Sequence, residues 1–229
     1  EAARPREGGS PMRGRRESTP AGAGPARGWI EAGRTPYGGR LLDCRPFTWN
    51  AKAKTPDPKA AERFLRLRAS RGEQLRRRTP SDALEIACRL DYPLDGDLGD
   101  GPLFRAQELE DKWDVFRHGD QIDFARSWTG DLVHRARVEP AAGRLVVTAV
   151  SSDAAAVDGD GRLAVRQVDY LLKSHLFGRV TPHPLPAGFP AEPQAIALYS
   201  FGAYGRRCAF ATFADTVAID LDAGEAAGE

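Results

Sequence analysis

The chain is organised around the stretch Asp111–Val138, DKWDVFRHGDQIDFARSWTGDLVHRARV, whose pattern predicts three consecutive strands. Trp113, Val115 and Phe116 are of types that strands favour, and the turn chemistry of residues 117–120 ends this run. Residues 122–128 then alternate apolar and polar at period two, as in a half-buried strand paired in a hairpin. A third alternating run covers residues 132–138. The stretch therefore predicts an antiparallel meander, which can leave one face in solvent.

Arg126 breaks the pattern of this meander, since it stands between Phe124 and Trp128 on the apolar face. A buried guanidinium without a partner is costly, so a group or water must meet it. One interpretation is a structural arginine, stacked on Trp128 and bonded to a carboxylate or to loop carbonyls. The other is a clamp for an anionic ligand, a carboxylate or phosphate, with Trp128 and Trp113 as the apolar wall. Both tryptophans also suit a plain core.

His134 follows Arg126 on the next strand, on a face that also carries Leu132 and Ala136. If His134 abuts Arg126 across the sheet, the pair suits an anionic ligand or an acid–base step. The alternative is a half-exposed hairpin histidine. The predicted ligand-binding residues are Arg126, Trp128, Trp113 and His134, and no residue is assigned a catalytic role.

Residues 112–130 also carry a recurring pattern: Lys-Trp-x-x-x-Phe, a Gly-Asp turn, then Phe-x-Arg-Ser-Trp-Thr-Gly. This pattern resembles an uncharacterised bacterial protein family, and the similarity extends back to residues 43–47 and forward to residues 201–212. The matching residues are Lys112, Trp113, Phe116, Gly119, Phe124, Arg126, Ser127, Trp128, Thr129 and Gly130. The family has no assigned activity, so the resemblance implies a recurring domain and adds no chemistry.

The remaining sequence predicts one ordered domain between two tails. Residues 1–40 are rich in Gly, Pro, Ala, Arg and Ser and are expected to be a disordered basic tail. Residues 41–216 are expected to form a single α+β domain, and residues 217–229 a loose acidic tail. The one methionine is Met12, which leaves two readings open: translation starts there, or the chain is a fragment.

Within the domain, period-two and helical spacings alternate along the chain. The predicted elements are strands at 41–49, 84–90, 145–150 and 208–213, and helices at 58–71, 165–176 and 195–204. The predicted fold is therefore α+β, with a curved antiparallel sheet of about five or six strands and two or three helices mainly on one face.

Composition narrows the environment and the partners. The chain has 229 residues and a formal charge of +1, which gives no general field for nucleic acid or an acidic membrane. No apolar run approaches the ~18 residues of a membrane helix, and the N-terminus lacks the apolar segment of a secretory signal. Three widely spaced cysteines, Cys44, Cys88 and Cys208, suit buried thiols in a reducing cytoplasm.

Motifs for the common cofactors are missing from the sequence. It has no glycine-rich phosphate loop, no Gly-x-Ser-x-Gly elbow and no zinc spacing of histidine and cysteine. Residues 158–161, Asp-Gly-Asp-Gly, match a fragment of a calcium loop without its later glutamate. His175, on the apolar face of its helix, is expected to be a core histidine. Neither a cofactor nor a metal is therefore expected.

Two hypotheses for the function follow. The first is a non-catalytic cytoplasmic binding or interaction module, with a protein partner or an anionic small molecule as the open alternatives. The second is a small enzyme acting on an anionic or nucleotide-derived small molecule, held by Arg126 with His134 as acid or base. The arginine-rich helix at 59–71 is better explained as a solvated face than as a nucleic-acid site, so nucleic acid is not expected as a partner.

Overall fold

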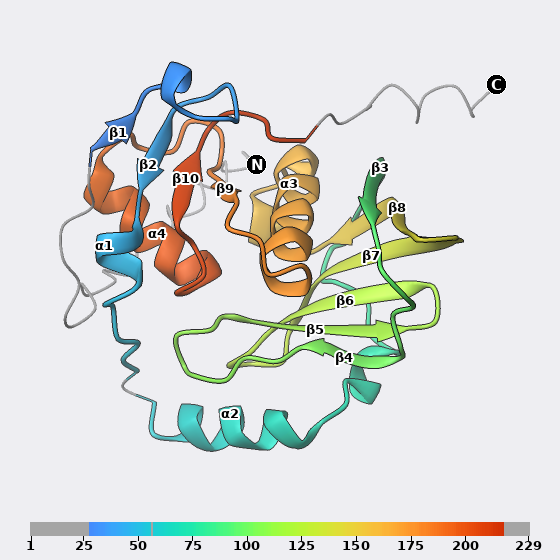
Figure 1. The fold of residues 1–229 in the computed structure, drawn as a ribbon. Helices are drawn as coiled ribbons and strands as arrows, with labels where there is room; N and C mark the ends of the chain where they lie inside the picture. Colours follow the sequence, from blue (N-terminus) through green and yellow to red (C-terminus); the bar gives the residue numbers. More distant parts are fainter. Residues whose placement is uncertain (1–27, 56, 218–229) are drawn as a thin grey trace, which may run out of the picture.

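The computed structural model describes residues 28–55 and 57–217, which form two sheets with a helix between them (Figure 1). The strands of the larger sheet are β3 (Leu84–Pro93), β4 (Gly101–Phe104), β5 (Trp113–His118), β6 (Gln121–Arg126), β7 (Leu132–Ala141) and β8 (Arg144–Ser152). They are antiparallel throughout, in the order β3-β8-β7-β6-β5-β4. The expected meander is the centre of this sheet.

The smaller sheet joins segments from both ends of the described chain. Its strands are β1 (Trp29–Ile30), β2 (Leu41–Asp43), β9 (Pro182–Pro184) and β10 (Phe210–Thr212), in the order β1-β2-β10-β9. Strand β10 is antiparallel to β2 and parallel to β9. This second sheet was not predicted, because its strands are too short to show a period.

The helices occupy three places around the sheets. They are α1 (Arg45–Thr48), α2 (Lys59–Ala69), α3 (Gly161–Leu171) and α4 (Pro193–Tyr204), with short turns η1 (Ala32–Arg34), η2 (Glu73–Leu75) and η3 (Ala155–Val157). Helix α3 lies between the two sheets and runs on into a π-helical turn, η4 (Leu172–Leu176). Helices α1 and α4 lie beside the smaller sheet, and α2 lies below the larger one in Figure 1.

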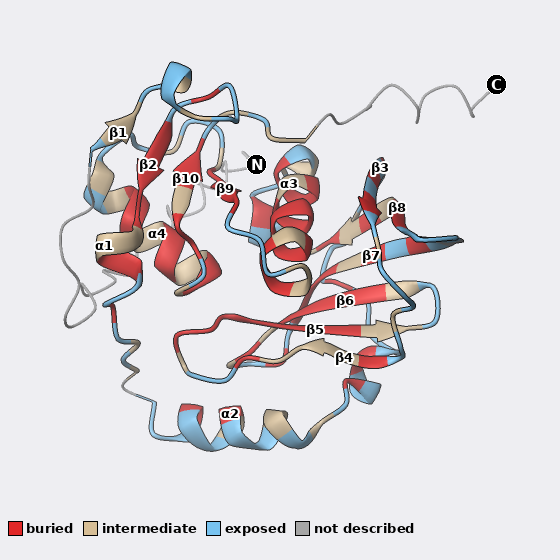
Figure 2. Ribbon diagram, viewed as in Figure 1, coloured by how far each residue is buried: buried red, intermediate tan, exposed pale blue. Residues whose placement is uncertain are grey.

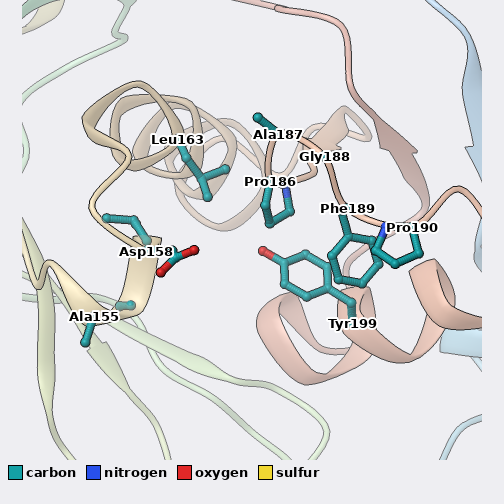
Figure 3. Close-up of a pocket in the computed structure, with 11 residues that line it drawn as sticks. Ala155, Asp158, Leu163, Pro186, Ala187, Gly188, Phe189, Pro190 and Tyr199 are labelled. Atoms are coloured by element: carbon teal, nitrogen blue, oxygen red, sulfur yellow. The ribbon is translucent and has the colours of Figure 1, made fainter. Parts of the chain in front are cut away.

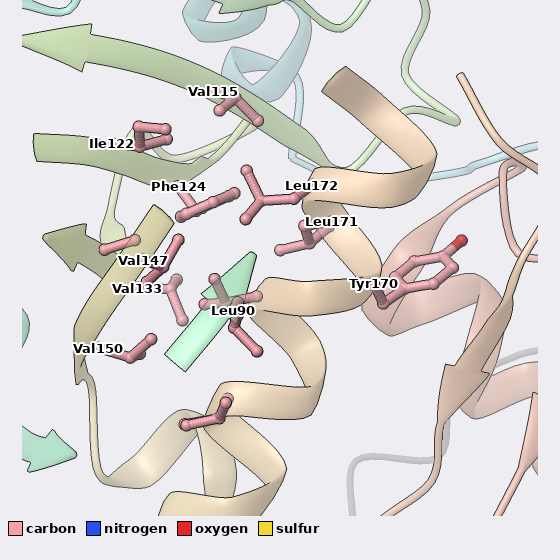
Figure 4. Packing of buried hydrophobic residues seen from close by; sticks show 14 of the residues in the cluster. Leu90, Val115, Ile122, Phe124, Val133, Val147, Val150, Tyr170, Leu171 and Leu172 are labelled. Carbon is pink, nitrogen blue, oxygen red and sulfur yellow. The ribbon is translucent and has the colours of Figure 1, made fainter. Parts of the chain in front are cut away.

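Helix α3 is buried on two sides, which explains its position. Its first turn is capped by the Asp160 carboxylate, which accepts a hydrogen bond from the backbone N–H of Leu163 at 3.0 Å. Leu171 and Leu172 pack into the core against the larger sheet, whereas Tyr170 points away from it toward the smaller sheet (Figure 4). The one helix therefore joins both sheets.

The other face of the larger sheet is also covered. Leu75 of η2 packs there with Phe116, Ala125 and Leu132 in a separate buried cluster. Most of α2 is solvent-exposed on its outer side, as expected for its arginines (Figure 2). The helix predicted at 58–71 ends at Ala69, and Gly72, which directly precedes η2, adopts the left-handed backbone with φ +86°.

The α+β class and the six-stranded antiparallel sheet are confirmed, and one predicted strand is wrong. The strand expected at 41–49 ends at Asp43, and α1 follows it. Arg45 binds back to the Asp43 carboxylate through Nε at 2.8 Å, and Pro46 sits in the first turn of α1, where its missing N–H costs nothing. Proline also cannot donate to a sheet ladder, which explains why the strand stops.

The tail boundary also differs from the expectation. Residues 1–27 and 218–229, most of the two predicted tails, lie outside the described residues. Residues expected in the N-terminal tail nevertheless form β1, which pairs with β2 through Trp29 and Leu42. The Trp29 ring also stacks on Phe213, with centroids 6.1 Å apart. The two apolar residues of β1, Trp29 and Ile30, form a strand although the sequence around them is rich in glycine and arginine. Among the described residues, no helix is long and apolar enough to span a bilayer.

Candidate functional site

Arg126 ties the end of β6 to the end of α4. Its two terminal guanidinium nitrogens donate to the backbone carbonyls of Ala203 and Gly202, each at 2.8 Å. Its guanidinium carbon lies 4.8 Å from the ring centroid of Trp113, its partner across the strands. Carbonyls in the last turn of a helix lack partners within the helix and carry partial negative charge, so a cation suits them.

These contacts are those of a structural arginine, with two corrections. The ring beneath the guanidinium is Trp113 and not Trp128, and the carbonyls belong to a helix end and not to a loop. The Trp113 indole N–H also donates to the Ala203 carbonyl, at 2.8 Å. These contacts explain the position of Arg126 without a ligand, and a ligand role for Arg126 stays a prediction.

His134 is sealed inside the protein, so the interpretation as a half-exposed histidine is wrong. It is fully buried, its ring stacks on Trp113 with centroids 5.6 Å apart, and its Nδ1 lies 2.9 Å from the Ser152 hydroxyl. Burial lowers the pKa of His134 to about 3, and the charge of Arg126 also lowers it. The imidazole is therefore neutral at physiological pH and poorly suited to acid–base catalysis there.

A register shift explains a second error about this strand. Strand β7 slips against β6 between Phe124 and Ala125, so that His134 pairs with Phe124 and Leu132 pairs with Ala125. Leu132 consequently lies in the cluster on the opposite face of the sheet. A bulge of this kind changes the face of every following residue, and the period-two pattern did not show it.

Trp128 lies apart from the Arg126 stack. Its indole N–H donates to the Leu109 carbonyl at 2.8 Å, and the Lys112 ammonium lies 4.2 Å from the centroid of its ring. The structure therefore brings Arg126, Trp113 and His134 together. Trp128 lies outside this group and packs against Lys112 instead.

A polar path continues from this group through α3 to α4. The Gln167 side chain lies close enough to His134, Tyr199 and Tyr204 to influence the pKa of each. The Tyr204 hydroxyl donates to the Pro184 carbonyl at 2.9 Å. Burial raises the pKa of Tyr199, and hydrogen bonding with Tyr204 and Gln167 lowers it to a smaller extent. Tyr199 is the half-buried member of this path, and it reaches an open hollow.

This hollow, which we call the Tyr199 pocket, has a volume of about 390 Å³. Three segments distant in sequence form it: η3 with the start of α3, the loop between β9 and α4, and α4 itself. The lining residues that matter here are Val157, Asp158, Leu163, Pro186, Phe189 and Tyr199. Figure 3 shows the Tyr199 hydroxyl and the Asp158 carboxylate pointing toward one another from opposite sides.

The backbone at Asp158 is unusual. Its φ is +52°, a left-handed conformation that aspartate tolerates better than most residues, and Gly159 follows at +74°. Opposite, the rings of Phe189 and Tyr199 lie side by side with centroids 4.8 Å apart and planes tilted by 45°. Among the described residues lining the pocket, Asp158 carries the one charged side chain.

A second hollow, of about 480 Å³, lies at the hairpin ends of the larger sheet. Both arginines that line it are paired with carboxylates. Arg117 lies 3.4 Å from the Asp97 carboxylate, and Arg144 donates to Asp91 at 2.6 Å. Unlike the Tyr199 pocket, this hollow has no aromatic residue among the described residues of its lining.

Serine and histidine side chains lie within hydrogen-bond distance of each other at three buried places among the described residues: Ser152–His134, Ser174–His175 and Ser200–His183. The Ser200 hydroxyl lies 2.7 Å from His183 Nε2 and 4.0 Å from the Cys44 thiol. All three side chains are fully buried, and burial lowers the pKa of His183 to about 3. Because all three side chains are buried, the pair is not open to a substrate and fits a structural role in the core.

Sequence reasoning missed Asp158 and Tyr199 as site residues. Residues 158–161 were predicted to be a loop, and the repeated Asp-Gly pair is a signal for the left-handed turn found there. Tyr199 gave no signal, because it is one apolar residue in a largely apolar helix. Among the residues that the structure describes, no three histidine, cysteine, aspartate or glutamate side chains come together to hold a metal ion.

Comparison of the chain with protein-family models, with curated proteins and with solved structures found no match, so the site is argued from its own geometry.

Proposed function

We propose that this chain is a non-catalytic binding module that takes a small molecule into the Tyr199 pocket. The observation that carries the proposal is the pairing of an open hollow of about 390 Å³ with two inward-pointing polar groups, the Asp158 carboxylate and the Tyr199 hydroxyl. Ligand sites commonly combine apolar walls with a few convergent polar groups of this kind.

The groups that catalysis would use are buried away from the pocket. A general base works best with a pKa near the working pH and within reach of its substrate. The pKa values of His134 and His183 are lowered to about 3, and burial raises the pKa of the Cys44 thiol to about 12. None of these three residues lines the pocket. They support the fold, and a binding role fits the pocket better than acid–base or nucleophilic chemistry.

Arg126 contributes to such a site by holding α4 in place. The C-terminal carbonyls of the helix are bound by Arg126 and Trp113, and the Tyr204 hydroxyl fixes the same end to Pro184. Tyr199 stands little more than one turn before these anchors. A rigid support of this kind lowers the entropy cost of binding, because the pocket wall is ordered before the ligand arrives.

The cytoplasm is the compartment that we propose. Cys44, Cys88 and Cys208 are free thiols, all buried. Reduced, unpaired cysteines are usual in the cytosol and less so in oxidising compartments.

A fragment screen by thermal shift on the full chain tests the proposal. Ala187→Trp would fill the Tyr199 pocket from its exposed rim, and Ala142→Trp makes the same change in the second hollow. A ligand at 100 times its Kd adds about 2.7 kcal/mol of stability, which is easily detected. We expect fragments that stabilise the wild type and Ala142→Trp but not Ala187→Trp. The proposal would be overturned if the fragments stabilise Ala187→Trp as much as the wild type, or if no fragment stabilises the wild type.

A further inference from the structure

We infer that the Tyr199 pocket selects a small organic cation: an amine or guanidinium carried on an apolar body. This inference rests on the proposed function and names its ligand class.

The carboxylate of Asp158 is available to a ligand, whereas those of the neighbouring aspartates accept hydrogen bonds from the backbone. The Asp153 carboxylate accepts from the backbone N–H of Ala155 at 2.9 Å, and Asp160 caps α3. Among the described residues, no hydrogen bond or ion pair engages the carboxylate of Asp158, which is exposed at the pocket. A ligand cation can therefore pair with it without displacing a partner.

Nearby cations do not compensate this charge. Arg162 and Arg166, on the first turns of α3, both pair with Asp215, at 2.7 and 3.4 Å. The partial positive charge at the N-terminus of α3 is offset by the carboxylate of its N-cap residue, Asp160. The pocket thus presents a net negative group, which repels anions and attracts cations.

The opposite wall suits the same ligand. Tyr199 and Phe189 present a pair of aromatic rings, and ring faces attract ammonium and guanidinium groups. The Tyr199 hydroxyl, pointing toward Asp158, can accept a hydrogen bond from the cation. Leu163 and Pro186 complete apolar walls for the ligand body, and about 390 Å³ is the size of a small-molecule site.

The inference reverses the chemistry expected from the sequence, where Arg126 suggested an anion. The guanidinium of Arg126 is bound to helix carbonyls, and it is not among the residues that line the pocket. The charge of Arg126 acts on the Tyr199 hydroxyl, whose pKa it lowers against the larger, opposite effect of burial.

A matched series of probes tests the charge preference: 2-phenylethylamine, 2-phenylethanol and phenylacetate, titrated by NMR against the full chain at neutral pH and low salt. We expect the amine to bind about tenfold more tightly than the alcohol, a factor equal to about 1.4 kcal/mol. Phenylacetate should bind more weakly than either. In Asp158→Asn, the amine should lose its advantage while the alcohol keeps its affinity. Asp131→Asn, an exposed carboxylate elsewhere, should change nothing.

The outcomes separate the inference from the proposed function. If the amine and the alcohol bind equally well in the wild type, at a site that Ala187→Trp blocks, cation selection is wrong and the binding module stands. If Asp158→Asn leaves the preference intact, Asp158 is not its source and the inference fails. If none of the three probes binds, the inference also fails, and the fragment screen alone then decides whether the pocket is a site.

Discussion

Arg126 and Trp113 donate hydrogen bonds to the same oxygen, the backbone carbonyl of Ala203, each at 2.8 Å. The two side chains also stack on each other, so a cation, an indole and a helix end form one unit. This unit connects the larger sheet to α4, and α4 carries Tyr199 into the pocket. The residue that looked most like a ligand clamp in the sequence thus supports the helix that lines the Tyr199 pocket.

Arg126→Met should destabilise the protein by about 3 kcal/mol, because two hydrogen bonds from a charged group are lost and the Gly202 carbonyl is left without its donor. Methionine preserves part of the packing on Trp113. Urea unfolding gives the free energy of unfolding, and Arg144→Met is the control: its pair with Asp91 is exposed, so less than about 1 kcal/mol should be lost. Equal losses in both variants would contradict the account of Arg126.

Asp114→Asn should cost about 3–5 kcal/mol, since it leaves Arg68 without its charge partner at a largely buried site. The Asp114 side chain is 5% exposed and also accepts from the backbone N–H of Ala106 at 2.9 Å. Glu108→Gln breaks the exposed pair with Arg206 and should cost less than about 1 kcal/mol. The same denaturation assay compares the two. A small effect of Asp114→Asn would mean that α2 is not anchored through this pair.

Stability should fall as the pH drops below about 6.5. The pKa values of His134, His175 and His183 are lowered to about 3 by burial, so these rings are neutral when folded and become protonated when unfolded. Between about pH 6.5 and 3 the unfolded state therefore binds more protons, and acid favours unfolding. Each histidine should contribute a loss of about 2 kcal/mol between pH 6.5 and 5.

NMR titration of the histidine rings checks this directly. The three buried rings should show no protonation above about pH 4.5 while the protein stays folded, because their pKa values are about 3. Titration of any of them near pH 6.5 in the folded protein would show that its ring is reached by water, and for His134 it would reopen the acid–base hypothesis.

Gly205→Ala should be far more harmful than Gly119→Ala, although both glycines have positive φ, +77° and +64°. A Cβ on Gly205 would lie 2.2 Å from the Glu110 carbonyl oxygen, whereas one on Gly119 meets nothing within 4 Å. Backbone strain alone costs about 1 kcal/mol or slightly more, and overpacking adds about 1–3 kcal/mol at Gly205. Thermal unfolding of the two variants measures the difference, and equal melting temperatures would contradict the close approach there.

The sequence predicted the elements that have a long, regular period. The hairpin of β5 and β6, with Gly119 in its turn, and the helical run around 165–176 both show clear spacing, and both are found. Strands β1 and β9 have two and three residues, too few for a period, and were missed, whereas β2 and β10 lie within the longer strands predicted at 41–49 and 208–213. The buried position of α3 between two sheets was also hidden, because polar residues such as Asp169 face partners far away in sequence, here the Tyr92 hydroxyl at 2.6 Å.

The candidate site was less predictable than the fold. Arg126, Trp113 and His134 do meet, as the alternation on one face suggested, but the partners that bind the guanidinium come from α4, about 77 residues later. The Tyr199 pocket needs three segments to approach one another, and no local pattern encodes that approach. Asp158 carried a visible signal for its backbone turn and none for its position opposite Tyr199.

A chemical-shift map of the ¹⁵N-labelled chain, titrated with 2-phenylethylamine, tests most directly whether the ligand binds in the Tyr199 pocket or at Arg126. We expect shifts concentrated at the backbone amides of residues 155–158, 187–189 and 199, around the Tyr199 pocket, and shifts at the same residues in Arg126→Met if that variant is folded. Shifts centred on Trp113, Arg126 and residues 202–203, and lost in Arg126→Met, would contradict this expectation and return the site to the arginine that the sequence first indicated.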